Sequence, residues 1–170
     1  VASGLARRPR ADILKQLDRI ELEAERLDTL IGQILQLSQL RSYKPTLPLE
    51  PIDLTTLLNE VVEDARLEAS GADKNVDWTP GESLWLNGHH DLMRSAIENV
   101  LRNAVRFTKA GSAVAVSLVR EHRDALITIQ DRGPGVPEAE LARIFEPFYR
   151  VAESRDRDSG GTGIGLAITA

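Results

Sequence analysis

The chain has 170 residues, with 21 Lys and Arg against 26 Asp and Glu, which gives a formal net charge of −5. This length allows one domain with its own core and a small appendage, and the 42% hydrophobic content excludes wholesale disorder. An acidic chain with 4% aromatic residues lacks the basic stripe of a general nucleic-acid binder, so no nucleic acid is expected as a partner. The absence of cysteine excludes a disulfide scaffold, a thiolate zinc site and a thiol nucleophile.

Both ends of the sequence look like cut points. The chain begins without Met at Val1 and stops at Ala170 inside an apolar stretch. No apolar run approaches the ~18–20 residues that cross a bilayer, and the N-terminus does not resemble a signal peptide. We therefore expect a fragment of a longer protein.

The first predicted element is a long helix from about Ala11 to Ser42, with no Pro and a single Gly. Its apolar residues recur at alternating steps of four and three, the heptad spacing of a helix that packs along another helix. These seam positions are Ile13, Leu17, Ile20, Ala24, Leu27, Ile31 and Ile34. An ordinary amphipathic helix is the alternative, but the regular seam favours coiled-coil-like packing and dimerisation of the full protein.

Three prolines between positions 45 and 51 end this helix and predict a domain boundary near residue 45, in a segment that is a linker or an edge strand. Beyond it, the predicted elements are a helix from its N-cap Asp53 to Gly71, strands at 75–79 and 84–86, a helix at 91–107, a hairpin of strands at 113–120 and 125–131, a short helix at 137–144 and a helical segment at 164–170. Strands and helices do not alternate strictly, so the predicted fold class is α+β, with helices layered on one sheet.

The first candidate site lies on the helix at 91–107. Asn99 and Asn103 are four residues apart, so both amides lie on one face, one turn apart, and Glu98 is beside them. Amides can offer oxygens to a hard cation and N–H groups to phosphate. Two solvent-facing asparagines are the alternative, although Asn is a poor residue inside a helix.

The second candidate is the string Asp131-Arg132-Gly133-Pro134-Gly135, directly after a strand. Its glycines permit a close approach of the backbone to a ligand. A tight turn around Pro134 is the alternative. Such a turn explains the glycines and the proline but not an aspartate at the end of an apolar strand.

The third candidate is the glycine-rich string from Gly160 to Leu166, which leads into a predicted helix. Backbone N–H groups at such a place can point at an anion. The string has no Lys, so it is not a phosphate loop of the Walker type, and its position fits the dinucleotide fingerprint poorly. A flexible linker is the alternative, but a linker would not run directly into Ile164, Leu166 and Ile168.

In this order and spacing, the three strings resemble the ATP-binding domain of the sensor histidine kinases of two-component systems, a fold shared with gyrase, Hsp90 and MutL-type ATPases. The matching motifs are an N box at Glu98–Ala104, a first glycine box at Asp131–Gly135, an F box at Phe145–Arg150 and a second glycine box at Gly161–Leu166. The resemblance covers about residues 12 to 170, and the stretch from Phe148 to Gly163 resembles the Cpx-like proteobacterial sensor kinases.

The resemblance implies a Bergerat-type fold, a two-layer sandwich in which helices cover a mixed β-sheet, after a long coiled-coil-like helix. Residues 1–44 would be the second helix of the dimerisation and histidine-phosphotransfer hairpin. Residues 45–170 would be the ATP-binding catalytic domain, truncated at its C-terminus.

The resemblance also implies roles for individual residues. Asp131 would accept a hydrogen bond from the adenine amino group. Asn103 would be the Mg²⁺ ligand with Asn99 nearby, and Glu98 would polarise the site, which makes Glu98 and Asn103 the implied catalytic residues. Arg106 would face the phosphates.

The remaining implied ligands surround the base and the phosphates. Phe107 would cover the adenine, and Gly133 and Gly135 would let the backbone pass beside it. Residues 151–160 would form the ATP lid. The residues that would cradle phosphate are Thr162, Gly163, Gly165 and Leu166.

The implied function is binding of Mg-ATP and, in the full protein, transfer of the γ-phosphoryl group to a His on the dimerisation helix and then to an Asp of a response regulator. The full protein would be a homodimer, and this chain the cytoplasmic portion of a bacterial inner-membrane protein. The family's acceptor string, His-Glu/Asp-x-x-x-Pro, is absent here, and we expect His89, His90 and His122 to be surface residues. Alternatives are a regulatory nucleotide-binding protein, a degenerate-kinase dimerisation scaffold without phosphotransfer, and a helical interaction protein.

Overall fold

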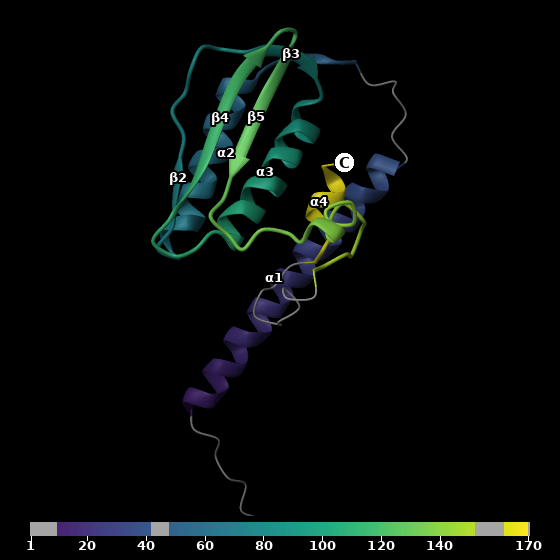
Figure 1. Ribbon diagram of the computed structural model, residues 1–170. Helices are drawn as coiled ribbons and strands as arrows, with labels where there is room; N and C mark the ends of the chain where they lie inside the picture. Colours follow the sequence, from purple (N-terminus) through teal and green to yellow (C-terminus); the bar gives the residue numbers. More distant parts are fainter. Residues whose placement is uncertain (1–9, 42–47, 152–161, 170) are drawn as a thin grey trace, which may run out of the picture.

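The computed structural model describes residues 10–41, 48–151 and 162–169. Its elements, in chain order, are α1 (Arg10–Arg41), β1 (Glu50–Asp53), α2 (Leu54–Ser70), β2 (Asn75–Asp77), β3 (Trp85–Gly88), α3 (His90–Phe107), β4 (Ala113–Glu121), β5 (Asp124–Gln130), the 3₁₀ helix η1 (Glu138–Glu140) and α4 (Gly165–Ile168) (Figure 1). The predicted boundary near residue 45 and nearly all of the predicted lid lie outside the described residues. Among the described residues, no helix is both long enough and apolar enough to cross a bilayer.

The helix α1 is a long rod that extends well beyond the α+β part, and its C-terminal half lies beside α4 (Figure 1). The predicted seam faces away from the rest of the chain. Its residues are exposed, for example Ile20 at 65% and Leu27 at 61%. Within residues 10–41, 48–151 and 162–169, no helix therefore covers the seam as the partner that the heptad spacing predicts.

The main sheet is mixed, in the order β2-β4-β5, with β2 parallel to β4 and β4 antiparallel to β5. Pairing of β4 with β5 continues to Glu121 and Asp124, so the hairpin turn is shorter than predicted and has only His122 and Arg123 at its tip. The strands β1 and β3 form a separate two-stranded sheet rather than joining the main one.

The helices α2 and α3 cover one face of the main sheet and enclose the core (Figure 1). Leu58 and Val62 of α2, Leu101 of α3 and Val114 of β4 are completely buried. The N-cap of α2 is confirmed, since Oδ1 of Asp53 accepts a hydrogen bond of 3.0 Å from the Thr55 N–H. The observed α+β sandwich preceded by a long helix matches the predicted fold.

Candidate functional site

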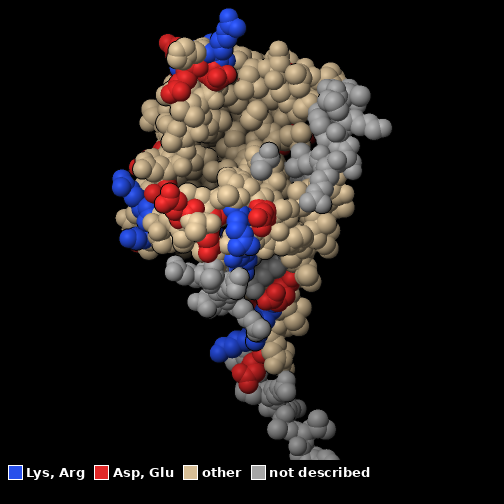
Figure 2. Space-filling model, turned by 45° about the vertical axis from the view of Figure 1, so that its right-hand side comes forward, with Lys and Arg blue, Asp and Glu red and all other residues tan. Residues whose placement is uncertain are grey.

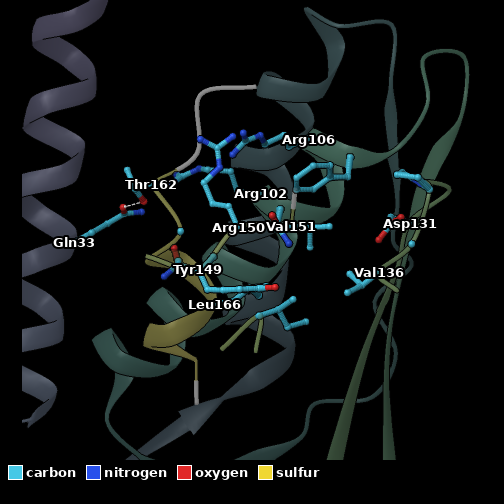
Figure 3. Close-up of a pocket in the computed structure, with 18 of the residues that line it drawn as sticks. Gln33, Arg102, Arg106, Asp131, Val136, Tyr149, Arg150, Val151, Thr162 and Leu166 are labelled. Carbon is cyan, nitrogen blue, oxygen red and sulfur yellow. Dashed lines mark hydrogen bonds between the residues drawn. The ribbon is translucent and has the colours of Figure 1, made fainter. Parts of the chain in front are cut away.

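A cavity of about 530 Å³ lies beside α3, a volume in the range of small-molecule sites. Five segments meet there: α1, α3, the segment after β5, the F-box segment (Phe145–Arg150) with its neighbours Ile144 and Val151, and the start of α4 (Figure 3). The described residues that line it are Thr29, Gln33, Asn99, Arg102, Asn103, Arg106, Phe107, Asp131, Pro134, Gly135, Val136, Ile144, Tyr149, Arg150, Val151, Thr162, Gly163, Gly165 and Leu166.

One face of α3 forms a wall of the cavity. Its lining residues follow the three- and four-residue spacing of a single helix face and are Asn99, Arg102, Asn103, Arg106 and Phe107. The opposite face is buried in the core, which fixes the rotation of the helix. The end of α3 is held by Lys74, whose Nζ donates hydrogen bonds of 2.9 Å to the carbonyls of Val105 and Arg106.

The two asparagines differ in their partners. Nδ2 of Asn99 donates a 2.9 Å hydrogen bond to the Ser95 carbonyl. A Cβ atom on Gly165 would lie 3.0 Å from Oδ1 of Asn99, so glycine permits the close approach of α4. The side chain of Asn103 lines the cavity and has no hydrogen bond within the described part of the chain.

The oxygen donors of the cavity lining fit Mg²⁺ only if a bound ligand supplies most of its coordination. The described residues contain no group of three or more His, Cys, Asp and Glu that could hold a metal ion. Mg²⁺ is commonly held by one or two protein oxygens together with substrate phosphates and water. The Asn103 amide oxygen fits such a site, in which most ligands would come from a bound polyphosphate.

The Asp131 end of the cavity is fixed by contacts with the end of α3. The Gly133 N–H donates a 2.6 Å hydrogen bond to Oδ1 of Asp131, which leaves Oδ2 as an acceptor. A Cβ atom on Gly133 would lie 2.7 Å from the Phe107 carbonyl oxygen, so only glycine fits there. The buried Thr108 accepts a 2.9 Å hydrogen bond from the Arg132 N–H. These contacts bring Asp131 and Phe107 to the same cavity.

The glycine string docks against the F-box segment. Gly163 has φ +73°, and its carbonyl accepts a 2.8 Å hydrogen bond from the Phe148 N–H. A Cβ atom on Gly163 would lie 2.7 Å from the Tyr149 carbonyl oxygen. The helix α4 has four residues, so its dipole contributes little, and the arginines supply most of the positive charge.

Negatively and positively charged side chains lie on opposite sides of the cavity. Figure 3 shows Asp131 and Val136 on one side and Thr162, Arg102 and Arg150 on the other. Desolvation of the half-buried Arg106, and then the nearby charge of Arg150, lower the pKa of Arg106. On the face drawn in Figure 2, acidic and basic side chains are interspersed. The described lining of the cavity, in contrast, holds three arginines and one carboxylate, which makes it locally positive.

The structure brings together ten of the twelve predicted site residues. They are Asn99, Asn103, Arg106, Phe107, Asp131, Gly135, Thr162, Gly163, Gly165 and Leu166. Gly133 lies behind the wall, against Phe107. Glu98 also does not line the cavity, since its Oε1 lies 2.7 Å from Nε of Arg94 in an ion pair. The polarising role of Glu98 stays a prediction that this geometry does not support.

Sequence reasoning missed several lining residues. Arg102 follows Asn99 by three residues, so the periodicity that identified Asn103 could have identified it too. Gln33 accepts a hydrogen bond from the Thr162 hydroxyl across 129 positions of sequence, and no local pattern marks that contact (Figure 3).

Comparisons with known proteins agree with this geometry. Residues 88–170 match the family model of the histidine kinase-, DNA gyrase B- and HSP90-like ATPases. The sensor histidine kinase CpxA of Escherichia coli K12 is 40% identical over 171 residues, which cover 99% of this chain and 36% of CpxA. SenX3 of Mycobacterium bovis is 30% identical over 151 residues, which cover 89% of this chain and 37% of SenX3. The chain thus spans little more than a third of these relatives.

Solved structures agree as well. The mycobacterial sensor histidine kinase MprB has a TM-score of 0.59 and 31% identity, over 71% of this chain and 75% of that one. Full-length ShkA in complex with AMPPNP has a TM-score of 0.72 and 26% identity, over 91% of this chain and 32% of that one. The predicted resemblance is confirmed: the chain belongs to the sensor histidine kinase family and contains its ATP-binding domain.

Proposed function

We propose that the cavity beside α3 binds Mg-ATP and that the chain is the catalytic part of a two-component sensor kinase. The observation that carries the proposal is the arrangement of charge in the cavity, with the Asp131 carboxylate on one side and arginines on the other (Figure 3), and with Asn103 in the same lining. An adenine nucleotide has the matching polarity, an amino group on its base and an anionic tail. The ShkA structure, solved with AMPPNP, supports this choice of ligand.

The purine would lie at the Asp131 end. Oδ2 of Asp131 can accept a hydrogen bond from the adenine amino group, since Oδ1 is already bonded to the Gly133 N–H. Phe107, Val136 and Ile144 supply apolar surface for the ring. Guanine carries a carbonyl oxygen where adenine carries the amino group, so a carboxylate at this place disfavours guanine.

The polyphosphate would lie at the arginine end, where Arg106 and Arg150 face the cavity. Their guanidinium groups can form paired, charge-assisted hydrogen bonds with phosphate oxygens. The Asn103 amide oxygen would be the protein ligand of Mg²⁺. When bound, Mg²⁺ neutralises charge on the β- and γ-phosphate oxygens.

The reaction would be transfer of the γ-phosphoryl group to a histidine that a dimerisation helix of the full protein presents. A nitrogen–phosphorus bond forms at the imidazole, and the bond from the γ-phosphorus to the β–γ bridging oxygen breaks, so that ADP leaves with the electron pair. The imidazole then releases its remaining N–H proton to solvent. None of the chain's three histidines lines the described cavity, so the acceptor would come from another segment or subunit.

Catalysis in this site would consist mainly of positioning and of stabilising charge. In the full protein, the exposed seam of α1 would pair with a second copy, since a heptad seam is buried by another helix. The phosphohistidine would then supply a response regulator, and the chain would be the cytoplasmic part of a membrane-bound sensor, as in the family.

The test is phosphorylation of the full-length protein with γ-labelled ATP, together with nucleotide titration. We expect label on histidine in the wild type and its loss in Asp131→Ala and Asn103→Ala. Tight ATP binding without any transfer would instead identify a regulatory or degenerate-kinase scaffold. A folded protein that binds no ATP in Mg²⁺ buffer would contradict the proposal as a whole.

A further inference from the structure

We propose that Arg102 is an additional ligand of the polyphosphate and that Glu68 competes with the phosphates for it. This inference rests on the proposed binding of ATP. It adds a residue outside the motifs that the sequence singled out, and it assigns a role to a carboxylate on α2 that lies outside the cavity lining.

The first observation is the position of Arg102. It lies on the cavity face of α3, three residues after Asn99 and four before Arg106. Figure 3 shows it on the same side of the cavity as Arg150 and Thr162, opposite Asp131. Its side chain is 55% exposed, so it can move toward a ligand without breaking core packing.

The second observation is how weakly Arg102 is held. Its Nε lies 3.6 Å from Oε1 of Glu68, beyond hydrogen-bond distance. Within the part of the chain that the structure describes, no hydrogen bond engages its two terminal amino groups. The Glu68 side chain is itself 51% exposed, and an ion pair between two exposed groups contributes little to stability.

Arg94, two helical turns earlier on α3, shows what a structural arginine looks like in this protein. Its Nη1, Nη2 and Nε lie 2.8, 2.8 and 2.7 Å from carboxylate oxygens of Glu60, Asp64 and Glu98. Arg94 does not line the cavity. The close ion pairs that connect α3 to α2 are thus those of Arg94 with Glu60 and Asp64, and they do not involve Arg102.

These observations define a simple exchange. Without nucleotide, Glu68 draws the Arg102 guanidinium toward α2. With nucleotide, the terminal amino groups of Arg102 bond to phosphate oxygens, because paired guanidinium–phosphate contacts are stronger than one exposed ion pair. Glu68 therefore lowers the affinity for polyphosphates and leaves the affinity for the base unchanged.

The experiment is calorimetric titration of the chain with ATP and with adenosine in Mg²⁺ buffer. The variants are Arg102→Gln, Glu68→Gln and their combination. Glu63→Gln is the matched control, since it removes the same charge from α2 at a carboxylate that pairs with Arg66, outside the cavity lining. Adenosine reports on the base site alone, so it separates loss of a phosphate contact from damage to the fold.

Arg102→Gln should weaken ATP binding about tenfold, the effect of one hydrogen bond between ionised groups, and leave adenosine binding unchanged. Glu68→Gln should tighten ATP binding about two- to fivefold, the effect of releasing one exposed ion pair. Glu63→Gln should change neither affinity, and Glu68→Gln should have no effect once Arg102 is replaced.

Unchanged ATP affinity in Arg102→Gln, or equal losses for ATP and adenosine, would overturn the proposal. Equal effects of Glu68→Gln and Glu63→Gln would overturn the competition by Glu68. If Arg102→Gln does not fold, the ATP affinity of Glu68→Gln tests the proposal instead. Tighter binding would support it, because a damaged protein would not bind ATP more tightly, and unchanged binding would overturn it. A wild type that binds neither ligand would refute the proposed function and this inference with it. A wild type that binds both leaves the proposed nucleotide binding in this cavity standing, whatever the variants show.

Discussion

Replacing Gly163 by alanine should damage the phosphate end of the cavity through two separate effects. At φ +73°, the left-handed conformation costs a residue with a side chain about 1–2 kcal/mol. The new Cβ would also lie 2.7 Å from the Tyr149 carbonyl oxygen and 2.8 Å from the Phe148 carbonyl carbon. Relieving this overlap requires a backbone shift that costs about 1–3 kcal/mol. The total is about 2–5 kcal/mol.

Gly135→Ala is the matched control for Gly163→Ala. Gly135 has φ +77°, but a Cβ atom there would meet no other atom within 4 Å, so the substitution should carry only the conformational cost of about 1–2 kcal/mol. Urea unfolding and ATP titration of both variants measure the difference. Part of the Gly163→Ala cost should appear as weaker ATP binding, because local opening can relieve the strain without unfolding the core. Equal losses of stability and of affinity in the two variants would refute the steric reasoning.

Four further predictions concern single side chains. Asn103→Ala should weaken ATP binding in Mg²⁺ buffer and leave binding in EDTA almost unchanged, by calorimetry. Asp131→Ala should weaken ATP and adenosine alike, by about tenfold for one hydrogen bond to a charged group. Thr108→Val removes the acceptor of the Arg132 N–H and should lower the free energy of unfolding in urea by about 1–3 kcal/mol. Desolvation raises the pKa of Asp53, but hydrogen bonds from the first turn of α2 lower it by more, so the net pKa lies below the ordinary value of an aspartate. The stability that this carboxylate contributes is therefore present at neutral pH. It is lost as the pH falls through ~3.9, the pKa in the unfolded chain, and then through the lower pKa of the folded protein. Asp53→Asn keeps the cap, so in unfolding measured at a series of pH values its free energy of unfolding should fall less steeply toward acid pH.

The parts of the site that could be predicted from the sequence are those encoded by local periodicity. Asn99 and Asn103 share a face because they are one turn apart, and Asp131 reaches the cavity because it directly follows the strand β5. Gly163 was predicted at the phosphate end, and its positive φ and its contact with Tyr149 give the physical reason for glycine there.

The parts that could not be predicted depend on contacts between distant segments. The family resemblance implied a polarising role for Glu98, yet Arg94 holds it toward the carboxylates of α2. Gln33 reaches the cavity only because α1 lies beside α4. The split of the strands into two sheets also has no local signal, because strand length and alternation do not specify which strands pair.

The most direct test of the central claim is a crystal structure of this chain with Mg²⁺ and a non-hydrolysable ATP analogue. The adenine amino group should lie within hydrogen-bond distance of Oδ2 of Asp131, with the phosphates between Arg106 and Arg150 and the metal on the Asn103 amide oxygen. A nucleotide bound in the reverse direction, or outside the cavity beside α3, would contradict the claim.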